Sequence, residues 1–381
     1  MTFQKVSRNL SLNSPLKLLT YEVRLISQKF NMSSVSNDSR RNLVFIGNCF
    51  LIFFYLTFSF SLISLYIPPH ILWISEIATL LIPVFVYSNC IIILFLFFFK
   101  KRSKIKWVGT LFFLLSFFYF STLFRISSMN ETTDPKCDFT VLSYNVSGFN
   151  ISHKQGFKES LARVISEKNT DFVCLQEFFP EKGPFLEALY PYQVVVAKKN
   201  VVGVTIFSKY PIIRNGLVFE GRSDFNKGIY ADVLIKGKVL RIVSVHFESN
   251  NLKKGNPFFP FKKVLRNAYW LKETSEIRST QVKKLIAFID STSFPLIVAG
   301  DFNETPYSYV YQNMKKKLNN GFEKKGNGFG FTFLPNKAFL RIDHQFFEPG
   351  KLSINNFQTF DTIHISDHVP VLGCYKFSVQ P

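Results

Sequence analysis

Three long apolar stretches occupy the first third of the chain, ahead of a more polar region. Leu43–Ile67 and Trp107–Phe124 contain no charged residue, and Ile71–Phe99 contains only Glu76. A helix that spans a membrane needs ~20 mostly apolar residues. The pattern therefore predicts three transmembrane helices, at about 43–67, 71–99 and 107–124. Pro83 removes a backbone hydrogen bond from the second helix, so a tilt or kink is expected there.

After residue 125 the pattern changes to short runs of strand and helix length. Residues 126–136 are polar and are expected to form a linker. Alternation of apolar and polar residues predicts a half-buried strand at Asp138–Asn145. Apolar residues at helical spacing predict helices at 157–169 and 274–289. Further strands are expected at 171–177, 193–197, 203–208, 295–300, 342–347, 351–357 and 369–377, with a hairpin around Gly237 at 230–246. The pattern predicts an α+β domain at 137–378, with two packed sheets covered by helices.

The distribution of cations predicts the membrane orientation. Residues 1–42 form a basic tail with seven Lys or Arg and two acidic residues, and Lys100–Lys106 contains five cations. The hairpin between the first two apolar stretches carries no formal charge. The positive-inside rule then assigns the tail and the Lys100–Lys106 loop to the cytoplasm. Three crossings leave everything after Arg125 on the outer side.

Glu76 has two interpretations. A carboxylate inside a membrane segment is a functional candidate by default. Glu76 also lies close enough to the beginning of its helix to reach the membrane interface, and this second interpretation is preferred. The pattern assigns no function to the tail.

The chain has a formal net charge of +20, and half of it, +10, belongs to residues 126–381. A basic domain suits a polyanionic partner, either nucleic acid or an anionic lipid surface. The five cysteines follow no metal-ligand spacing. Cys174 lies inside a strand-like run, as a buried structural thiol would.

Polar residues recur at the ends of the expected strands or in the loops that follow. These residues are Asn145, Glu177, His246, Asp301, Asn303, Asp343, Asp367 and His368. Since strand ends hold side chains rigidly at one edge of a sheet, we expect one site at the edge of the sandwich.

Four of these residues suit the binding of a metal and a phosphate. Glu177 is the best metal carboxylate, and Asn145 is its neutral neighbour. Asp301 could align water or a metal, while the Asn303 amide could donate a hydrogen bond to a phosphate oxygen. Acid-rich sites of this kind commonly hold Mg²⁺, which prefers oxygen ligands and substrate phosphate.

The remaining four residues suit proton transfer. His246 and His368 offer two imidazoles for acid–base chemistry. Asp343 and Asp367 could each orient one of these imidazoles. The set predicts an enzyme that cleaves a phosphate ester.

Six short motifs carry a family resemblance when taken in order. They read SYN, LQE, SVHFES, GDFNETPYS, RIDH and SDHVP, and they lie between Ser143 and Pro370. In this order they resemble the endonuclease/exonuclease/phosphatase superfamily, with its deoxyribonuclease-like fold, over residues 137–378. The resemblance implies a four-layer α/β/β/α sandwich and a phosphoesterase that depends on Mg²⁺ or Mn²⁺.

The resemblance also implies roles for single residues. Asn145 and Glu177 would bind the metal, and Asp301 and Asn303 would contact the scissile phosphate. His246 and His368 would be the catalytic imidazoles. Asp343 would support His368, and Asp367 would lie beside the metal or His246. Three N-terminal helices ahead of such a domain resemble an arrangement common in bacterial members. This implies an integral protein of a bacterial inner or plasma membrane.

The resemblance leaves the substrate open. A nuclease that hydrolyses phosphodiester bonds of nucleic acid, whether as endonuclease or exonuclease, is favoured. The alternative is a phosphoesterase acting on phospholipid, as sphingomyelinases do, or on inositol polyphosphates. Lys253–Lys263, with cations beside four phenylalanines, could bind either nucleic acid or lipid headgroups, or pack on the domain. A catalytically silent binding module is disfavoured because no catalytic position is lost.

A disulfide between Cys137 and Cys374 is a further possibility that depends on the resemblance. In this family the opening and last strands are antiparallel neighbours, so the two cysteines could meet. Strand parity could instead send their side chains to opposite faces. If the domain faces an oxidising compartment, such a bridge would join its two ends.

Overall fold

The computed structural model describes residues 37–98, 104–126, 136–149, 157–198, 200–250, 260–334, 339–363 and 366–378. The chain divides into two compact units, Met1–Leu56 and Thr57–Pro381. Most of the predicted tail and linker, and of the Lys100–Lys106 and Lys253–Lys263 segments, lies outside the described residues.

In the described part of the chain, four helices precede the sheets: α2 (Asn37–Ser64), α3 (Ile74–Leu80), α4 (Ile82–Phe98) and α5 (Lys104–Leu123). The prediction of three spans is wrong as it stands. Among the described helices only one, at Arg41–Ser64, is both long and apolar enough to cross a membrane. The apolar helix found within α5 among the described residues, Lys106–Phe117, is shorter than a span requires.

The second predicted span consists of two helices rather than one. The axes of Ile74–Leu80 and Ile82–Leu96 differ by 45°, and the pair could form one broken span or a re-entrant loop. The bend lies next to Pro83, the second residue of α4, where a missing N–H costs no helical hydrogen bond. The kink expected at Pro83 is confirmed as a helix boundary.

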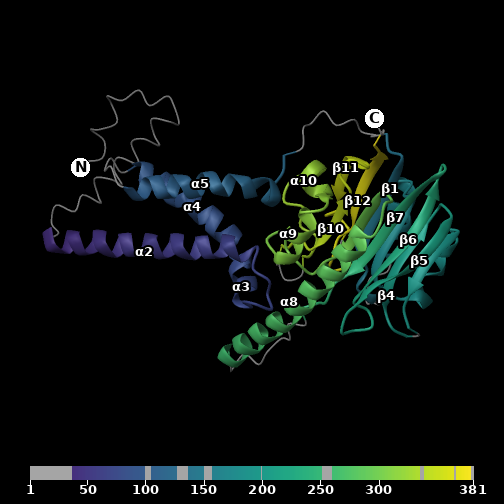
Figure 1. Ribbon diagram of the computed structural model, residues 1–381, viewed down its shortest axis with the longest axis horizontal. Helices are drawn as coiled ribbons and strands as arrows, with labels where there is room; N and C mark the ends of the chain where they lie inside the picture. Colours follow the sequence, from purple (N-terminus) through teal and green to yellow (C-terminus); the bar gives the residue numbers. More distant parts are fainter. Residues whose placement is uncertain are drawn as a thin grey trace, which may run out of the picture. The chain divides into compact units, whose positions relative to one another are not determined.

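Two mixed six-stranded sheets form the rest of the chain (Figure 1). The first has the order β11-β12-β1-β2-β4-β3 and the second β5-β6-β7-β8-β10-β9. The strands of the first sheet are β1 (Phe139–Asn145), β2 (Phe172–Phe178), β3 (Tyr192–Val196), β4 (Gly203–Ser208), β11 (Leu352–Thr359) and β12 (Val371–Phe377). The second contains β5 (Ile212–Glu220), β6 (Lys227–Ile235), β7 (Lys238–His246), β8 (Leu296–Asp301), β9 (Asn319–Asn320) and β10 (Asp343–Phe347). Each sheet has one parallel pair, β1 with β2 and β7 with β8.

Three apolar clusters separate four layers. The first cluster lies between the sheets and includes Val141, Ile206, Ile242 and Ile297. On the outer face of the first sheet, residues of β1 and β2 pack against α6 (Phe157–Glu167) and α7 (Pro184–Glu187). On the outer face of the second sheet, β7 and β8 pack against α8 (Pro260–Asp290) and α9 (Tyr309–Lys315). The predicted sandwich of two sheets between helices is confirmed.

The remaining elements are short. They are the 3₁₀ turns η1 (Ser147–Phe149) and η2 (Pro180–Lys182) and the helix α10 (Gly321–Lys325). Figure 1 shows α9 and α10 beside β10. Asn320 caps α10 by accepting a hydrogen bond from the Glu323 N–H, and Ser308 caps α9 in the same way through Tyr311.

A disulfide joins Cys137 to Cys374, with their Cα atoms 5.5 Å apart. Cys137 lies just before β1, and Cys374 lies within β12, the antiparallel neighbour of β1. The bridge considered from the sequence is therefore present. Cys174 is buried in the apolar layer between the sheets, as predicted.

Candidate functional site

The carboxyl ends of the two parallel strand pairs bring four predicted residues together. Asn145 ends β1, Glu177 lies one residue before the end of β2, His246 ends β7 and Asp301 ends β8. His246 and Asp301 are direct neighbours in the register of β7 and β8. Asp343 begins β10 opposite Asp301. The topology therefore explains why residues far apart in the sequence share one site.

Asp301 is at the centre of this cluster and is almost fully buried. Its Oδ2 accepts a hydrogen bond from Asn145 Nδ2 at 2.9 Å. The same oxygen lies 3.7 Å from the Nε2 atoms of both His246 and His368. Asn145 Nδ2 also donates to Glu177 Oε1 at 3.3 Å. One carboxylate oxygen thus faces both imidazoles.

The backbone turns sharply at two of these residues. Glu177 has φ 51° and Asn303 has φ 49°, in the left-handed region that non-glycine residues rarely adopt. The pairing of β2 with β4 is irregular between Leu175 and Phe178, which directs Glu177 away from the regular strand face. Asn303 is held by its N–H, which donates to Asp301 Oδ1 at 2.8 Å, and by its amide, which donates to the Phe247 carbonyl at 3.0 Å.

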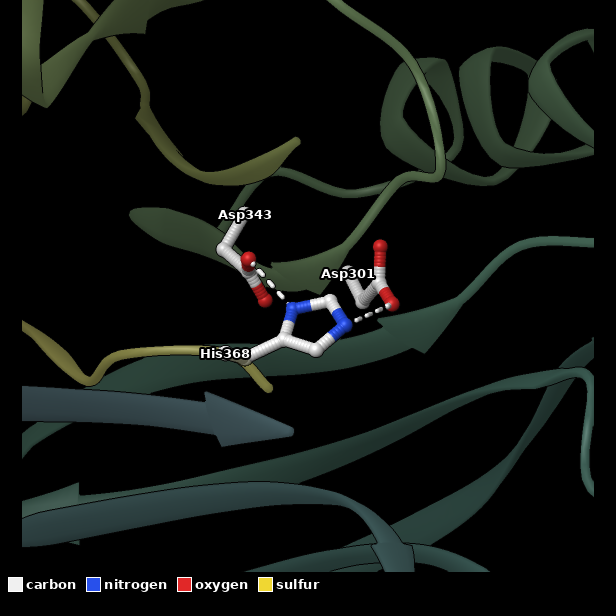
Figure 2. A group of neighbouring side chains, drawn as sticks. All are labelled: Asp301, Asp343 and His368. Carbon is white, nitrogen blue, oxygen red and sulfur yellow. Dashed lines mark hydrogen bonds and ion pairs between the residues drawn. The ribbon is translucent and has the colours of Figure 1, made fainter. Parts of the chain in front are cut away.

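His368 and Asp343 form a close pair. His368 Nδ1 lies 2.8 Å from Asp343 Oδ2, and Figure 2 shows the imidazole between Asp343 and Asp301. Burial alone would lower the pKa of His368, but the carboxylates of Asp343 and Asp301 outweigh burial and raise this pKa to about 10. The two carboxylates therefore favour the protonated form of the imidazole.

His246 has a backbone partner in place of a carboxylate at its Nδ1. Its Nδ1 lies 3.2 Å from the Phe225 carbonyl oxygen, which can only accept a hydrogen bond. In the neutral ring, Nδ1 therefore carries the proton and Nε2 has a free lone pair. That Nε2 is buried and has no hydrogen-bond partner among the described residues, and Glu177 Oε1 lies 3.8 Å from it.

The donor atoms fit a divalent cation. Among the described residues, Asp301, Asp343 and His368 each offer one ligand atom, and these atoms lie within 4.8 Å of one another. Asp343 Oδ1 and His246 Nε2 are buried polar atoms that lack a hydrogen-bond partner in this part of the structure. Burial raises the pKa of Asp343, only partly offset by His368. Buried carboxylates of this kind are usually paired with cations.

Asp367 differs from the other predicted site residues. Its carboxylate is exposed and accepts a hydrogen bond from Ser366 Oγ at 3.2 Å. It follows that Asp367 lies at the rim, while the buried cluster consists of Asn145, His246, Asp301, Asp343 and His368, with Glu177 partly exposed beside it.

Sequence reasoning missed three supporting groups. The Phe225 carbonyl sets the tautomer of His246, and Thr332 Oγ1 accepts a hydrogen bond from the Asp343 N–H at 3.0 Å. The Phe333 ring packs against His368, with centroids 4.9 Å apart. A backbone carbonyl leaves no signal in a sequence. Thr332 and Phe333 lie outside the six motifs, so no pattern marked them.

Comparison with known proteins agrees with this geometry. Residues 142–368 match the Endonuclease/Exonuclease/phosphatase family. A search of curated proteins gives no match. Among solved structures, the chain is similar to an endonuclease/exonuclease/phosphatase from Bacteroides vulgatus, with 17% identity, a TM-score of 0.50, and coverage of 63% of this chain and 99% of the other.

Two further structures resemble the chain with TM-scores below 0.5. One is D. rerio TDP2 complexed with single strand DNA product, with 15% identity, a TM-score of 0.48, and coverage of 62% of this chain and 98% of that chain. The other is the 3'-5' exonuclease NExo from Neisseria meningitidis, with 17% identity, a TM-score of 0.46, and coverage of 62% and 100%. At these identities the likeness concerns the fold alone. From the family match and the buried Asp and His cluster, the chain belongs to the endonuclease/exonuclease/phosphatase family and is a phosphoric ester hydrolase.

Proposed function

We propose that this protein is a membrane-anchored, divalent-metal-dependent phosphodiesterase, and that it is a nuclease. One observation carries the proposal of phosphodiester hydrolysis. Asp301 Oδ2 lies 3.7 Å from each of two imidazole Nε2 atoms and accepts a hydrogen bond from Asn145. Such a cluster can bind a phosphate, orient a water and move its proton.

The acidic residues of the cluster suit Mg²⁺ or Mn²⁺. Asp301, Asp343 and Glu177 are the carboxylates that would hold the ion, with Asn145 beside them. When bound, a divalent cation supplies Lewis-acid stabilisation of charge on the phosphate oxygens. Asp367, at the rim, is the further ligand proposed from the sequence.

The two imidazoles have different roles in this proposal. His246 Nε2 has a free lone pair, so it can accept a proton from the attacking water. The carboxylates beside His368 raise its pKa to about 10, so it suits stabilisation of negative charge on the phosphate or donation of a proton to the leaving oxygen. Asp301 and Asn303 lie where they can orient the water and the phosphate.

The charge of the region after residue 125 supports a nucleic-acid substrate. Residues 126–381 have a net charge of +10, and a basic domain attracts a phosphate backbone. A second candidate is a phosphate ester in a lipid headgroup. It is favoured by the exposed rings of Phe329 (41%) and Phe339 (50%), in the segment whose Phe333 packs against His368.

We also propose that the catalytic domain faces an oxidising, outer compartment. One apolar helix near the N-terminus and the disulfide between Cys137 and Cys374 support this proposal. Protease added to intact spheroplasts should digest the domain. A reporter fused after Pro381 that works only in the cytoplasm would overturn the assignment.

Hydrolysis assays with the purified full chain in detergent test the function. Single-stranded and duplex DNA, RNA, sphingomyelin or phosphatidylcholine vesicles, and inositol phosphates should be compared with Mg²⁺ and with Mn²⁺. We expect cleavage of nucleic acid, and its loss in Asp301→Asn. Cleavage of vesicle lipid with intact nucleic acid would favour the second candidate. A preparation that cleaves none of these phosphate esters would overturn both.

A further inference from the structure

Glu76 belongs to a buried ion cluster of the second compact unit. Its side chain is only 5% exposed, and Glu76 Oε1 lies 3.7 Å from Arg278 Nη2. Arg278 lies on α8 and is fully buried. The sequence favoured a Glu76 that reaches the membrane interface. In the structure this side chain is buried against the Arg278 guanidinium.

Arg278 connects this carboxylate to the turn that carries Asp301 and Asn303. Its Nε donates to Glu304 Oε1 at 2.5 Å, and Glu304 directly follows Asn303 in the chain. Its Nη1 donates to the Glu248 carbonyl at 3.0 Å and to Asn250 Oδ1 at 2.8 Å. Its Nη2 has no hydrogen bond among the described residues, so Glu76 is the group that faces this nitrogen.

A second contact joins the end of α5 to the segment that leads to Asp343. The Arg341 guanidinium donates to the Thr122 carbonyl, and Arg341 lies two residues before Asp343. Arg341 also stacks over the Phe322 ring at 3.8 Å. Thr122 Oγ1 donates to Glu323 Oε1 at 3.1 Å. Helices α3 and α5 are therefore connected to both segments that carry the central carboxylates.

We propose that Glu76 is a positioning residue of the active site, which holds the Asp301–Asn303 turn through Arg278 and Glu304. The helical region before the sheets is thus part of the catalytic support as well as an anchor. For its activity readout this inference rests on the proposed phosphodiester hydrolysis.

Burial explains why the Arg278 guanidinium needs partners besides the Glu304 carboxylate. Arg278 is fully buried, and a buried guanidinium must have its N–H groups and its charge compensated. Glu76 lies 3.7 Å from Arg278 Nη2 and also shares a side-chain hydrogen bond with Glu304. Without Glu76, Arg278 and Glu304 both lose this buried neighbour, so the Glu304 side chain is expected to shift. A displacement of about 1 Å in a catalytic group can reduce a rate by about 100-fold.

The test compares Glu76→Ala, Glu76→Gln and Glu76→Asp in the full chain in detergent. The matched control is Thr79→Ala, because Thr79 is buried on the same helix but its hydroxyl donates to the Glu76 carbonyl oxygen and not to Arg278. Hydrolysis of bis(4-nitrophenyl) phosphate gives kcat and KM. Hydrogen exchange of the peptide that covers residues 300–308 reports on the turn without any substrate.

We expect Glu76→Ala and Glu76→Gln to lower kcat by about 10- to 100-fold with KM within about twofold, and to speed exchange at 300–308. Glu76→Asp should recover part of both losses, and Thr79→Ala should leave both near the parent values. The nearly isosteric Glu76→Gln keeps the test valid if Glu76→Ala does not fold. Equal exchange and equal kcat in Glu76→Gln and Thr79→Ala would overturn the inference. If the parent chain cleaves no diester, the proposed function fails, while the exchange result still decides the role of Glu76.

Discussion

Asp343 Oδ2 lies 2.8 Å from His368 Nδ1, which directs the opposite ring nitrogen of His368 towards Asp301. The pair does two things at once: it fixes the orientation of the imidazole and it holds the ring protonated. Because the carboxylate is itself buried, its interaction with His368 is weakly screened by solvent.

Asp343→Asn should remove the charge that keeps His368 protonated. The pKa of His368, raised to about 10 in the parent, should fall because burial then acts with less opposition. We expect kcat to fall by about 100-fold or more, in the range typical of acid–base groups. The NMR titration of His368 and the pH–rate profile measure both effects. An unchanged His368 titration would contradict the assignment.

Activity should depend on a divalent cation. A chelator should abolish hydrolysis, and Mg²⁺ or Mn²⁺ should restore it, because the clustered oxygen ligands of Asp301 and Asp343 suit such an ion. The cation should also raise the Tm, since it binds the folded state. Asp301→Asn should lose this rise in Tm, whereas Asp361→Asn, at an exposed position, should keep it. Undiminished activity in excess chelator would refute the dependence.

His246 and His368 should act as one unit. Each alanine variant should lower kcat by about 100-fold or more, and the double variant should lose less than the product of the two losses. The reason is that both Nε2 atoms face the same Asp301 oxygen. His70→Ala, at an exposed position, is the control. Strictly multiplicative losses would show that the two imidazoles act independently.

His344 should make the fold sensitive to acid. Burial, with a contribution from the Arg341 charge, lowers the pKa of His344 to about 3, compared with 6.5 for an unperturbed imidazole. Above pH 6.5 the ring is neutral in both states and its contribution to stability is complete. Between 6.5 and 3 the unfolded chain binds a proton that the folded chain does not, so the free energy of unfolding falls by up to about 1.4 kcal/mol per pH unit.

The measurement is chemical unfolding at pH 7.5 and pH 4.5 with chelator present. His344→Gln should show a smaller loss between these values than the parent, because glutamine does not titrate. His70→Gln serves as the control, at an exposed position. Equal pH dependence in parent and His344→Gln would exclude this role of His344.

The disulfide should stabilise the sandwich. Replacing Cys137 and Cys374 together by serine should lower the free energy of unfolding by about 2–4 kcal/mol, the usual range for such bridges. Cys49→Ser, at an exposed cysteine, should have little effect. If a reducing agent changes neither the Tm nor the mobility of the parent on a denaturing gel, the bridge does not form in the isolated protein.

The sequence predicted the strands that have a clear apolar pattern. Gly203–Ser208 was predicted with the observed bounds, because an apolar run ends there at a turn. Ile212–Glu220 was missed, because this edge strand is mostly exposed and pairs only with β6. The helix expected at 274–289 begins earlier, at Pro260. Its first turns have no clear apolar periodicity, so the sequence pattern did not reveal them. Proline is well tolerated at the first position of a helix.

The candidate site was predicted more completely than its surroundings. Parallel strands bring their carboxyl ends to one edge, so side chains at those ends could be grouped from the sequence. The tautomer of His246 depends on a backbone carbonyl from a distant segment, which no pattern reveals. The length of an apolar run also does not separate a membrane span from a helix that packs on the protein. For this reason the prediction of three spans was wrong.

The covalent link between Cys137 and Cys374 also determines how the protein responds to mechanical force. The chain enters the first sheet just after Cys137, and its last strand, β12, ends three residues after Cys374, so a pull on the chain before and after the domain runs through the S–S bond. The sequence between them, whose ends are separated by 237 positions, is bypassed by that load. Tension along the chain can therefore reach the ends of the domain without separating the strands that hold the catalytic side chains.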